Sequence, residues 1–189
     1  MKPYGLVIYN MLRMTIKKTF QCKNIEYSTI EMLSRKMKIK LKRGSKLQLG
    51  TNLVSDGYGN IIVDEHGEVY IGDRVYFNDA FMISCKEKVT IGEETRFGPN
   101  VKIFDNDHKF DGKNGVSAEH KAKEIKIGKS CWIASNVVIL KGTEIGDNCV
   151  IGAGCVVQGK IPKASIVTQD RNLIIRPDRK STRLNSSHC

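Results

Sequence analysis

The chain carries a large apolar residue at every sixth position over long stretches between residues 71 and 157. These repeat positions are Ile71, Phe77, Ile83, Ile91, Phe97, Ile103, Ile127, Ile133, Ile139, Ile145, Ile151 and Val157. A small residue, mostly glycine, often follows directly, and a small or β-branched residue often stands four places later. A period of six fits neither an amphipathic helix, which repeats every 3.6 residues, nor one face of a strand, which repeats every two.

Three sides, each one repeat long, would close one triangular coil of parallel strands. Successive coils then stack about 4.8 Å apart, and the repeat residues point inward and form a continuous core. The pattern supplies four such coils, over residues 71–88, 91–108, 127–144 and 145–162. An irregular coil over residues 49–67 precedes them. The glycines are expected to accommodate corners that a Cβ would obstruct. The fold class is therefore all-β, a parallel β-helix.

The rest of the chain divides around this domain. Residues 1–48 are expected to form a basic helical or irregular segment, with a short helix such as Ile25 to Met37. The β-helix occupies residues 49–165, where Pro162 closes the last coil because it cannot donate to a ladder. Residues 166–177 form a C-terminal extension. Residues 178–189, DRKSTRLNSSHC, resemble the translation of a sequencing-adaptor read and are expected to be an artefact that replaced the native C-terminus.

The repeat is interrupted after FDNDHKFDG. A regular coil over residues 109–126 would place Lys109, Gly115 and Lys121 at core positions, so this segment is expected to leave the coil as a loop. It contains Gly-Lys-Asn-Gly, which suits a turn, and the repeat resumes in phase at Ile127. His108 is the last residue before the predicted exit. In an oligomer the loop could reach a neighbouring subunit and cover a groove.

Composition narrows the class of protein. The 189 residues are 40% hydrophobic and 27% charged, no apolar run approaches the roughly 20 residues of a membrane span, and no signal peptide is evident, so cytoplasmic residence is expected. The net charge is +11, or +9 without the adaptor-like tail, and is concentrated in KMKIKLKRGSK, Lys36 to Lys46. This segment is either simply solvated or meets an anionic membrane surface or substrate. No nucleic-acid-binding motif accompanies it.

The spacing of the cysteines and histidines does not indicate a metal site or a redox-active disulfide. The six cysteines show no Cys-x-x-Cys pair, and Cys131, Cys149 and Cys155 share one phase of the repeat, so they are expected to be small buried thiols. A zinc site would need three converging histidines, yet His66 and His120 have no support from the repeat. No metal is expected.

The repeat resembles the hexapeptide [LIV]-[GAED]-x-x-[STAV]-x of the left-handed β-helix acyltransferases. The segments 91–110 and 127–162 resemble, respectively, the stretch that ends in the catalytic histidine of sugar and xenobiotic O-acetyltransferases and the signature block of the maltose, galactoside and serine acetyltransferase group. The resemblance covers about residues 45–165 and implies left-handed coils, a homotrimer with grooves between subunits, and acetyl-CoA as donor. The family's usual Gly-Asn-Pro-Ala-Lys-like ending is absent from residues 166–177.

The resemblance also implies roles for particular residues. His108 would be the general base that takes the proton of an attacking hydroxyl, a task that suits an imidazole with an ordinary pKa near 6.5. The other candidates each have a plainer alternative. Asn78, Asp105 and Trp132 would contact the acceptor; alternatively, Asn78 satisfies a corner of the coil, Asp105 is a turn carboxylate like Asp107, and Trp132 packs in the trimer contact. Ser135, Ala153 and Lys160 would contact the coenzyme; alternatively, Lys160 is simply an exposed lysine.

The implied function is transfer of acetyl from acetyl-CoA to a hydroxyl of a sugar or polysaccharide precursor. Where the family often has an acidic acceptor contact, this chain reads SCKEK, Ser84 to Lys88, so the acceptor is expected to differ from galactosides and maltose. Two other hypotheses stay open. One is N-acetylation of a nucleotide-linked amino sugar, and the other is a non-catalytic trimeric β-helix scaffold.

Overall fold

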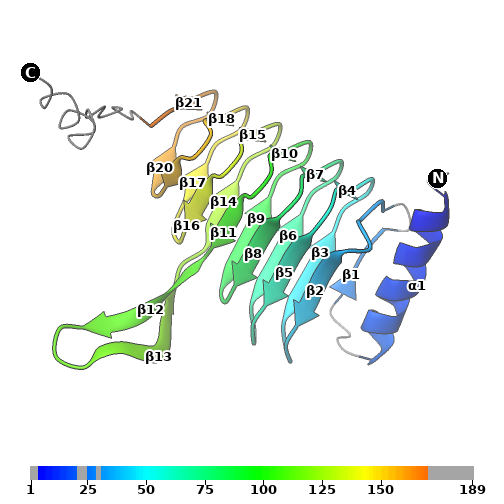
Figure 1. The fold of residues 1–189 in the computed structure, drawn as a ribbon, viewed down its shortest axis with the longest axis horizontal. Coiled ribbons are helices and arrows are strands. Elements are labelled where there is room, and N and C mark those ends of the chain that lie inside the picture. The colour runs from blue at the N-terminus through cyan, green and yellow to red at the C-terminus, as the bar shows by residue number, and fades with distance from the viewer. Residues whose placement is uncertain (1–3, 21–24, 29–30, 170–189) are drawn as a thin grey trace, which may run out of the picture.

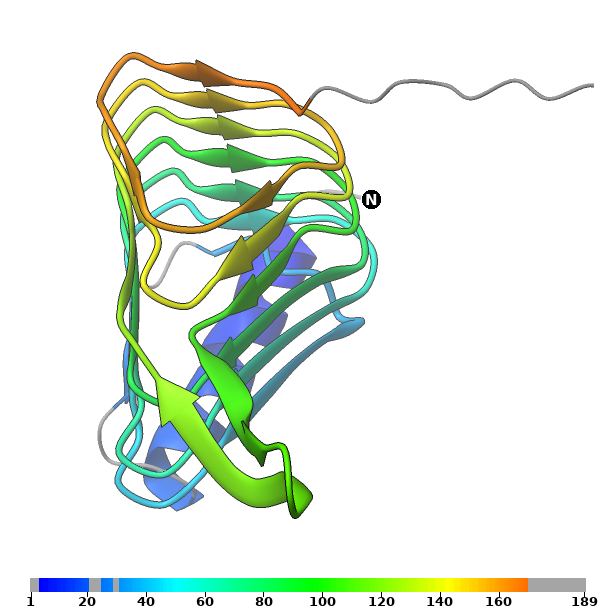
Figure 2. The same ribbon diagram turned by 90° about the vertical axis from the view of Figure 1, so that its left-hand side faces the viewer.

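The computed structural model describes residues 4–20, 25–28 and 31–169. These residues form a helix followed by a solenoid of parallel strands, from which one antiparallel hairpin projects (Figure 1). The view along the solenoid shows coils with three sides, each side belonging to one sheet (Figure 2). We name the sheets A, B and C.

The three sheets are built from short strands that the chain visits in turn. Sheet A contains β1 (Ile25–Glu26), β3 (Lys46–Leu49), β6 (Glu68–Ile71), β9 (Lys88–Ile91), β14 (Ile125–Ile127), β17 (Glu144–Ile145) and β20 (Lys160–Ile161). Sheet B contains β4 (Val54–Ser55), β7 (Tyr76–Phe77), β10 (Arg96–Phe97), β15 (Trp132–Ile133), β18 (Val150–Ile151) and β21 (Ile166–Val167). Sheet C contains β2 (Met37–Leu41), β5 (Gly59–Val63), β8 (Phe81–Cys85), β11 (Lys102–Phe104), β16 (Val138–Leu140) and β19 (Val156–Val157).

The register confirms the six-residue repeat. The twelve repeat residues stack in three columns, for example Ile71, Ile91, Ile127 and Ile145 along sheet A. All twelve are buried and belong to one continuous core. Cys131, Cys149 and Cys155 are buried as free thiols, as their shared phase predicts. The architecture is therefore the predicted left-handed parallel β-helix with triangular coils.

Glycines at the corners between sheets A and B are required by close approach of successive coils. A Cβ on Gly92 would lie 2.6 Å from the backbone nitrogen of Lys129 in the next coil. The left-handed backbone conformation falls two residues later, on non-glycine residues such as Glu94 and Ser130. Gly92 is thus needed for contact distance rather than for a positive φ.

The N-terminal region departs from expectation. Helix α1 (Tyr4–Phe20) lies across the first coil (Figure 1), with Met14 buried in the core and Asn10 Nδ2 donating to the carbonyl oxygen of Leu33 at 2.8 Å. The predicted helix from Ile25 to Met37 is wrong, because β1 begins at Ile25 and β2 at Met37. Strands of the β-helix therefore begin within the segment 1–48, before the predicted boundary at residue 49.

The coils shorten along the chain. The register pairs Leu49 with Ile71 in an early coil, Ile127 with Ile145 in a later one, and Ile145 with Ile161 in the last, so the spacing between paired residues falls along the chain. The coil that contains the hairpin is the exception, because Ile91 pairs there with Ile127. Beyond Pro162 the chain continues into β21, which pairs with β18, so Pro162 does not end the last coil. The predicted adaptor-like segment 178–189 lies outside the described residues.

The interruption of the repeat is an ordered hairpin. Strands β12 (Asn106–Asp111) and β13 (Gly115–Ala122) pair antiparallel and project from the corner between sheets C and A (Figure 2). The predicted loop 109–126 thus begins earlier, at Asn106, and His108 lies within the hairpin instead of ending the coil. No helix in the described part of the chain is long and apolar enough to cross a membrane.

Candidate active site

The hairpin leaves the coil beside a buried carboxylate. Asp105 is fully buried and accepts hydrogen bonds from the backbone amides of Lys86, at 2.9 and 3.0 Å, and Glu87, at 2.8 Å. Asn106 Nδ2 also donates to it at 2.9 Å. The carboxylate therefore fastens the hairpin to the turn of the preceding coil. It offers no surface to an acceptor in this structure, which corrects the predicted substrate contact in favour of the turn-capping alternative.

His108 is held on β12 with its ring exposed. Its Nδ1 lies 3.3 Å from the carbonyl oxygen of Ser117 on β13. A carbonyl oxygen only accepts, so this contact favours the tautomer in which Nδ1 carries the proton. Nε2 is then left with a lone pair, which is the form that a general base needs.

A second histidine, which the sequence did not single out, faces the first. His120 on β13 is the strand partner of His108, and the two ring centroids are 4.2 Å apart with the planes inclined at 41°. Removal from water, the positive charge of Lys86 and the proximity of His108 together lower the pKa of His120. A lowered pKa favours the neutral form of this ring beside His108 at neutral pH.

Asp107 points elsewhere. Its carboxylate forms an ion pair with Lys141, which lies at the same corner of the following coil. Lys141 is largely covered whereas Asp107 is half exposed. Neither Asp105 nor Asp107, the carboxylates nearest His108 in sequence, orients its ring, and the carbonyl of Ser117 holds the ring instead.

Three other predicted residues share a different corner, between sheets B and C. Asn78, Ser135 and Ala153 follow β7, β15 and β18 at this corner in their respective coils. Successive coils are linked there by backbone bonds such as Gly154 N to Ser135 O at 2.8 Å. The Asn78 side chain accepts a hydrogen bond from the amide of Asp79 at 2.7 Å, as a corner amide would.

Trp132 is the only tryptophan and is exposed on sheet B, between Arg96 and Val150 in neighbouring strands. It borders a surface depression of about 440 Å³ that Arg96 and Arg74 also line. Its indole is therefore available to a neighbouring subunit or a ligand, and this chain does not bury it.

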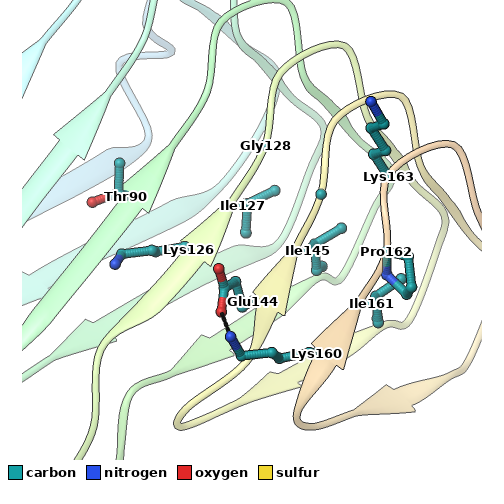
Figure 3. Close-up of a pocket in the computed structure, with 11 residues that line it drawn as sticks. Thr90, Lys126, Ile127, Gly128, Glu144, Ile145, Lys160, Ile161, Pro162 and Lys163 are labelled. Atoms are coloured by element: carbon teal, nitrogen blue, oxygen red, sulfur yellow. Dashed lines mark ion pairs between the residues drawn. The ribbon is translucent and has the colours of Figure 1, made fainter.

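Lys160 extends from sheet A near the end of the solenoid. Its side chain is 84% exposed and pairs with Glu144 at 3.1 Å. It lines a groove of about 460 Å³ together with Lys126 and Lys163, and Glu144 is the one carboxylate among the described residues that line this groove (Figure 3). Lys160 also borders a second depression, of about 400 Å³, which Lys123 lines as well, just after the hairpin. The first of these two depressions thus carries an excess of positive charge around Lys160.

A single chain does not bring all these residues together. His108 belongs to the corner between sheets C and A, whereas Asn78, Ser135 and Ala153 belong to the corner between B and C. The chain runs along sheet C from Ser135 to Lys141, which spans about 20 Å of extended strand. In the described residues no group of three or more histidine, cysteine or acidic side chains could hold a metal ion.

The fold and this hairpin together define an acyltransferase of the left-handed β-helix class. The chain belongs to the hexapeptide-repeat transferase family, which a relative similar over most of both chains shows. Residues 124–159 match the family described as "Bacterial transferase hexapeptide (six repeats)". The chain is 30% identical to a provisionally assigned lipopolysaccharide biosynthesis O-acetyl transferase, WbbJ, of Escherichia coli (strain K12), over 75% of this chain and 74% of that protein.

Solved structures agree on the fold. A galactoside acetyltransferase in complex with coenzyme A is 26% identical, with a TM-score of 0.51 over 87% of this chain and 73% of that one. A variant of AntD, an N-acyltransferase from Bacillus cereus in complex with dTDP-4-amino-4,6-dideoxyglucose and coenzyme A, has a TM-score of 0.66 over 88% and 90% of the two chains. Its identity is 13%, so this second likeness concerns the fold alone.

Proposed function

We propose that the protein is an acetyl-CoA-dependent O-acetyltransferase that acts on a hydroxyl of a sugar or polysaccharide precursor, with His108 as general base. The observation that carries the proposal is the place of His108 on the hairpin, with Nδ1 directed at the Ser117 carbonyl oxygen. A hydroxyl is a poor nucleophile until a base accepts its proton. Nε2 of His108 is the atom that accepts it, and the resulting imidazolium returns the proton to the leaving thiolate.

The residues of the predicted coenzyme site suit a donor of this chemistry. Acetyl-CoA, when bound, supplies the thioester whose acetyl group is transferred. Ser135 and Ala153 carry small side chains on an accessible corner, which leaves room for a slender pantetheine chain against the backbone. Lys160 is exposed close to two further lysines, where it can meet phosphate groups.

The separation of the two corners favours a homotrimer. If the corner of one subunit that carries His108 faces the corner of its neighbour that carries Ser135, both sets of residues line one groove. Two inactive variants, His108→Ala and Ser135→Trp, test this arrangement. Co-expressed, they should recover part of the activity, because some grooves then pair an intact His108 with an intact Ser135. Activity no higher than that of either variant alone would contradict a shared site.

Release of free thiol from acetyl-CoA tests the proposed reaction directly. Wild type is assayed against sugars, nucleotide sugars and amino sugars, beside His108→Ala and the matched control His66→Ala. We expect His108→Ala to lose roughly 10²–10⁴ of turnover, the usual contribution of a general base, and His66→Ala to stay close to wild type. Full turnover by His108→Ala would refute the mechanism.

The same assay decides the alternatives. Faster turnover of an amino sugar than of any hydroxyl acceptor would favour N-acetylation, to which the fold likeness to AntD lends a precedent of shape only. Failure of acetyl-CoA to bind, measured by calorimetry, would favour a non-catalytic scaffold.

A further inference from the structure

The outer face of helix α1 is an exposed apolar stripe. Its large side chains recur at helical spacing and are between 42% and 73% exposed: Tyr4, Ile8, Met11, Leu12 and Ile16. Five such residues on one face of a 17-residue helix exceed the scattered apolar residues of an ordinary surface. An apolar surface of this kind marks a site of interaction with another molecule or a membrane.

The other face of α1 is fixed to the solenoid, which sets the direction of the stripe. Met14 and Asn10 are buried, and the guanidinium of Arg13 donates to the carbonyl oxygen of Met37 on β2. β2 is the outermost strand of sheet C, so α1 caps the first coil (Figure 1). Because Met14 and Asn10 face the coil, the stripe on the opposite side of the helix faces away along the solenoid. Coils packed side by side, as in the proposed trimer, make contact through their lateral sheets and leave this end open.

Positive charge surrounds the capped end. Residues 1–48 contain 12 lysines and arginines and two glutamates, a net of +10, whereas the rest of the chain contains 19 basic and 18 acidic side chains, a net of +1. Lys38 and Lys40 project outward from β2, whereas Lys42 at the following corner pairs with Asp64 at 2.6 Å. One of the two glutamates, Glu31, is buried, and burial raises its pKa to about 8, so it offsets little of this charge at neutral pH.

We propose that α1 and a basic rim, formed by the exposed lysines Lys38 and Lys40 of β2, bind the surface of a bilayer that contains anionic lipid, with the apolar stripe inserted at the level of the headgroups. An amphipathic helix beside clustered lysines and arginines gains both from burying its apolar face and from attraction to anionic lipid. The basic segment alone left such a contact open, and the structure adds the apolar surface beside it. The binding surface goes beyond the proposed acetyl transfer and does not depend on it.

The charge also argues against a second copy of the chain as the occupant. Two molecules that met end to end through this stripe would bring two regions of net +10 together, and like charges at short range oppose association. An anionic bilayer satisfies the stripe and the rim at once. A lipid surface is therefore the occupant that the observations favour.

Co-sedimentation of the whole protein with lipid vesicles tests the proposal. Vesicles of phosphatidylcholine are compared with vesicles that also contain phosphatidylglycerol, at low and high salt. The variant Ile8→Gln/Leu12→Gln/Ile16→Gln changes only exposed positions, so the fold should persist. Ile166→Gln, at an even more exposed isoleucine in the last coil, is the matched control.

We expect wild type and Ile166→Gln to bind the anionic vesicles and to dissociate at high salt. The triple variant should bind at least about tenfold more weakly, and Lys38→Gln/Lys40→Gln should lose much of the preference for anionic lipid. Absence of wild-type binding, or undiminished binding by the triple variant, would overturn the proposal. The proposal would also be overturned if the mass of the wild-type protein in solution increased with protein concentration and the triple variant, but not Ile166→Gln, abolished this increase. That result would assign the stripe to pairing of two copies of the chain.

Discussion

The coils and the hairpin β12–β13 belong to one continuous chain, yet their side chains lie in opposite environments. In the coils, side chains alternate between a fully buried interior and the surface, as in β8, where Phe81, Ile83 and Cys85 are all buried. In the hairpin almost every side chain is exposed, and Phe110 and Val116 are among the most exposed apolar residues of the described chain. Burial in the core thus stabilises the coils, whereas the hairpin depends on strand pairing and on contacts at its base.

This difference separates the residues that maintain the fold from those that can carry chemistry. The hairpin contributes no residue to the buried core, and it is fastened through Asp105 and through the ion pair of Asp107 with Lys141. His108 and His120 can therefore change without disturbing the packing of the coils. A substitution of equal size should have very different effects in the two regions.

The largest effect on stability is expected for Phe97→Ala. Phe97 stacks on Phe77 with ring centroids 5.0 Å apart, inside the core. Loss of a buried phenylalanine leaves a cavity and typically costs about 3–5 kcal/mol of the free energy of unfolding. Phe110→Ala on the exposed hairpin should change it by less than about 0.5 kcal/mol. Denaturant unfolding of both variants makes the measurement, and equal losses would refute the distinction between the regions.

A smaller effect is expected at the base of the hairpin, where two aspartates give a matched pair. Asp105→Asn replaces one acceptor oxygen by a donor facing the amides of Lys86 and Glu87, so we expect a loss of about 2–3 kcal/mol. Asp107→Asn removes only a half-exposed ion pair and should cost less than about 1 kcal/mol. The same unfolding measurements test the pair, and an Asp107 variant as unstable as the Asp105 variant would contradict this account.

The sequence predicted the coils best where their period is regular. From Ile127 to Ile145 one coil consists of three sides of equal length, so every inward side chain falls on the repeat. The coils before Ile71 are longer, because their corners between sheets C and A contain extended turns such as Asp64 to Gly67. Paired inward residues there, such as Leu49 and Ile71, still stack, but they stand 22 positions apart (71 − 49), so the six-residue repeat loses its phase between one coil and the next. The strands before residue 49 were missed for that reason.

The candidate site was only partly predictable for a related reason. A missing apolar repeat located the interruption and His108, but not the pairing of the two strands that leave the coil. A bulge between His108 and Phe110 shifts the register, so His120 rather than a residue nearer the turn faces His108. The burial of Asp105 depends on the amides of residues 86 and 87 in the previous coil, a contact that local sequence does not reveal.

The smallest expected effect is a shift in the titration of His120. Desolvation, Lys86 and His108 all lower its pKa from the ordinary value of 6.5, while a hydrogen bond with the backbone of Ala118 and the charge of Asp64 oppose them. The unfolded chain therefore takes up this proton at a higher pH than the folded hairpin does. The contribution of His120 to hairpin stability is then fully present above about pH 6.5 and declines as the pH falls below it.

Proton NMR of the imidazole Cε1–H signals measures this titration. We expect the midpoint for His120 to lie below 6.5, and Lys86→Met to move it upward because a nearby positive charge is removed. Thr90→Ser, on the outer surface of sheet A, is the control and should leave the midpoint unchanged. A wild-type midpoint above 6.5, or no response to Lys86→Met, would show that water and counter-charges reach the hairpin base as freely as its tip. His120, the strand partner of His108, would then be no better shielded than the exposed turn of the hairpin, and the anchoring contacts at the hairpin base would not reach it.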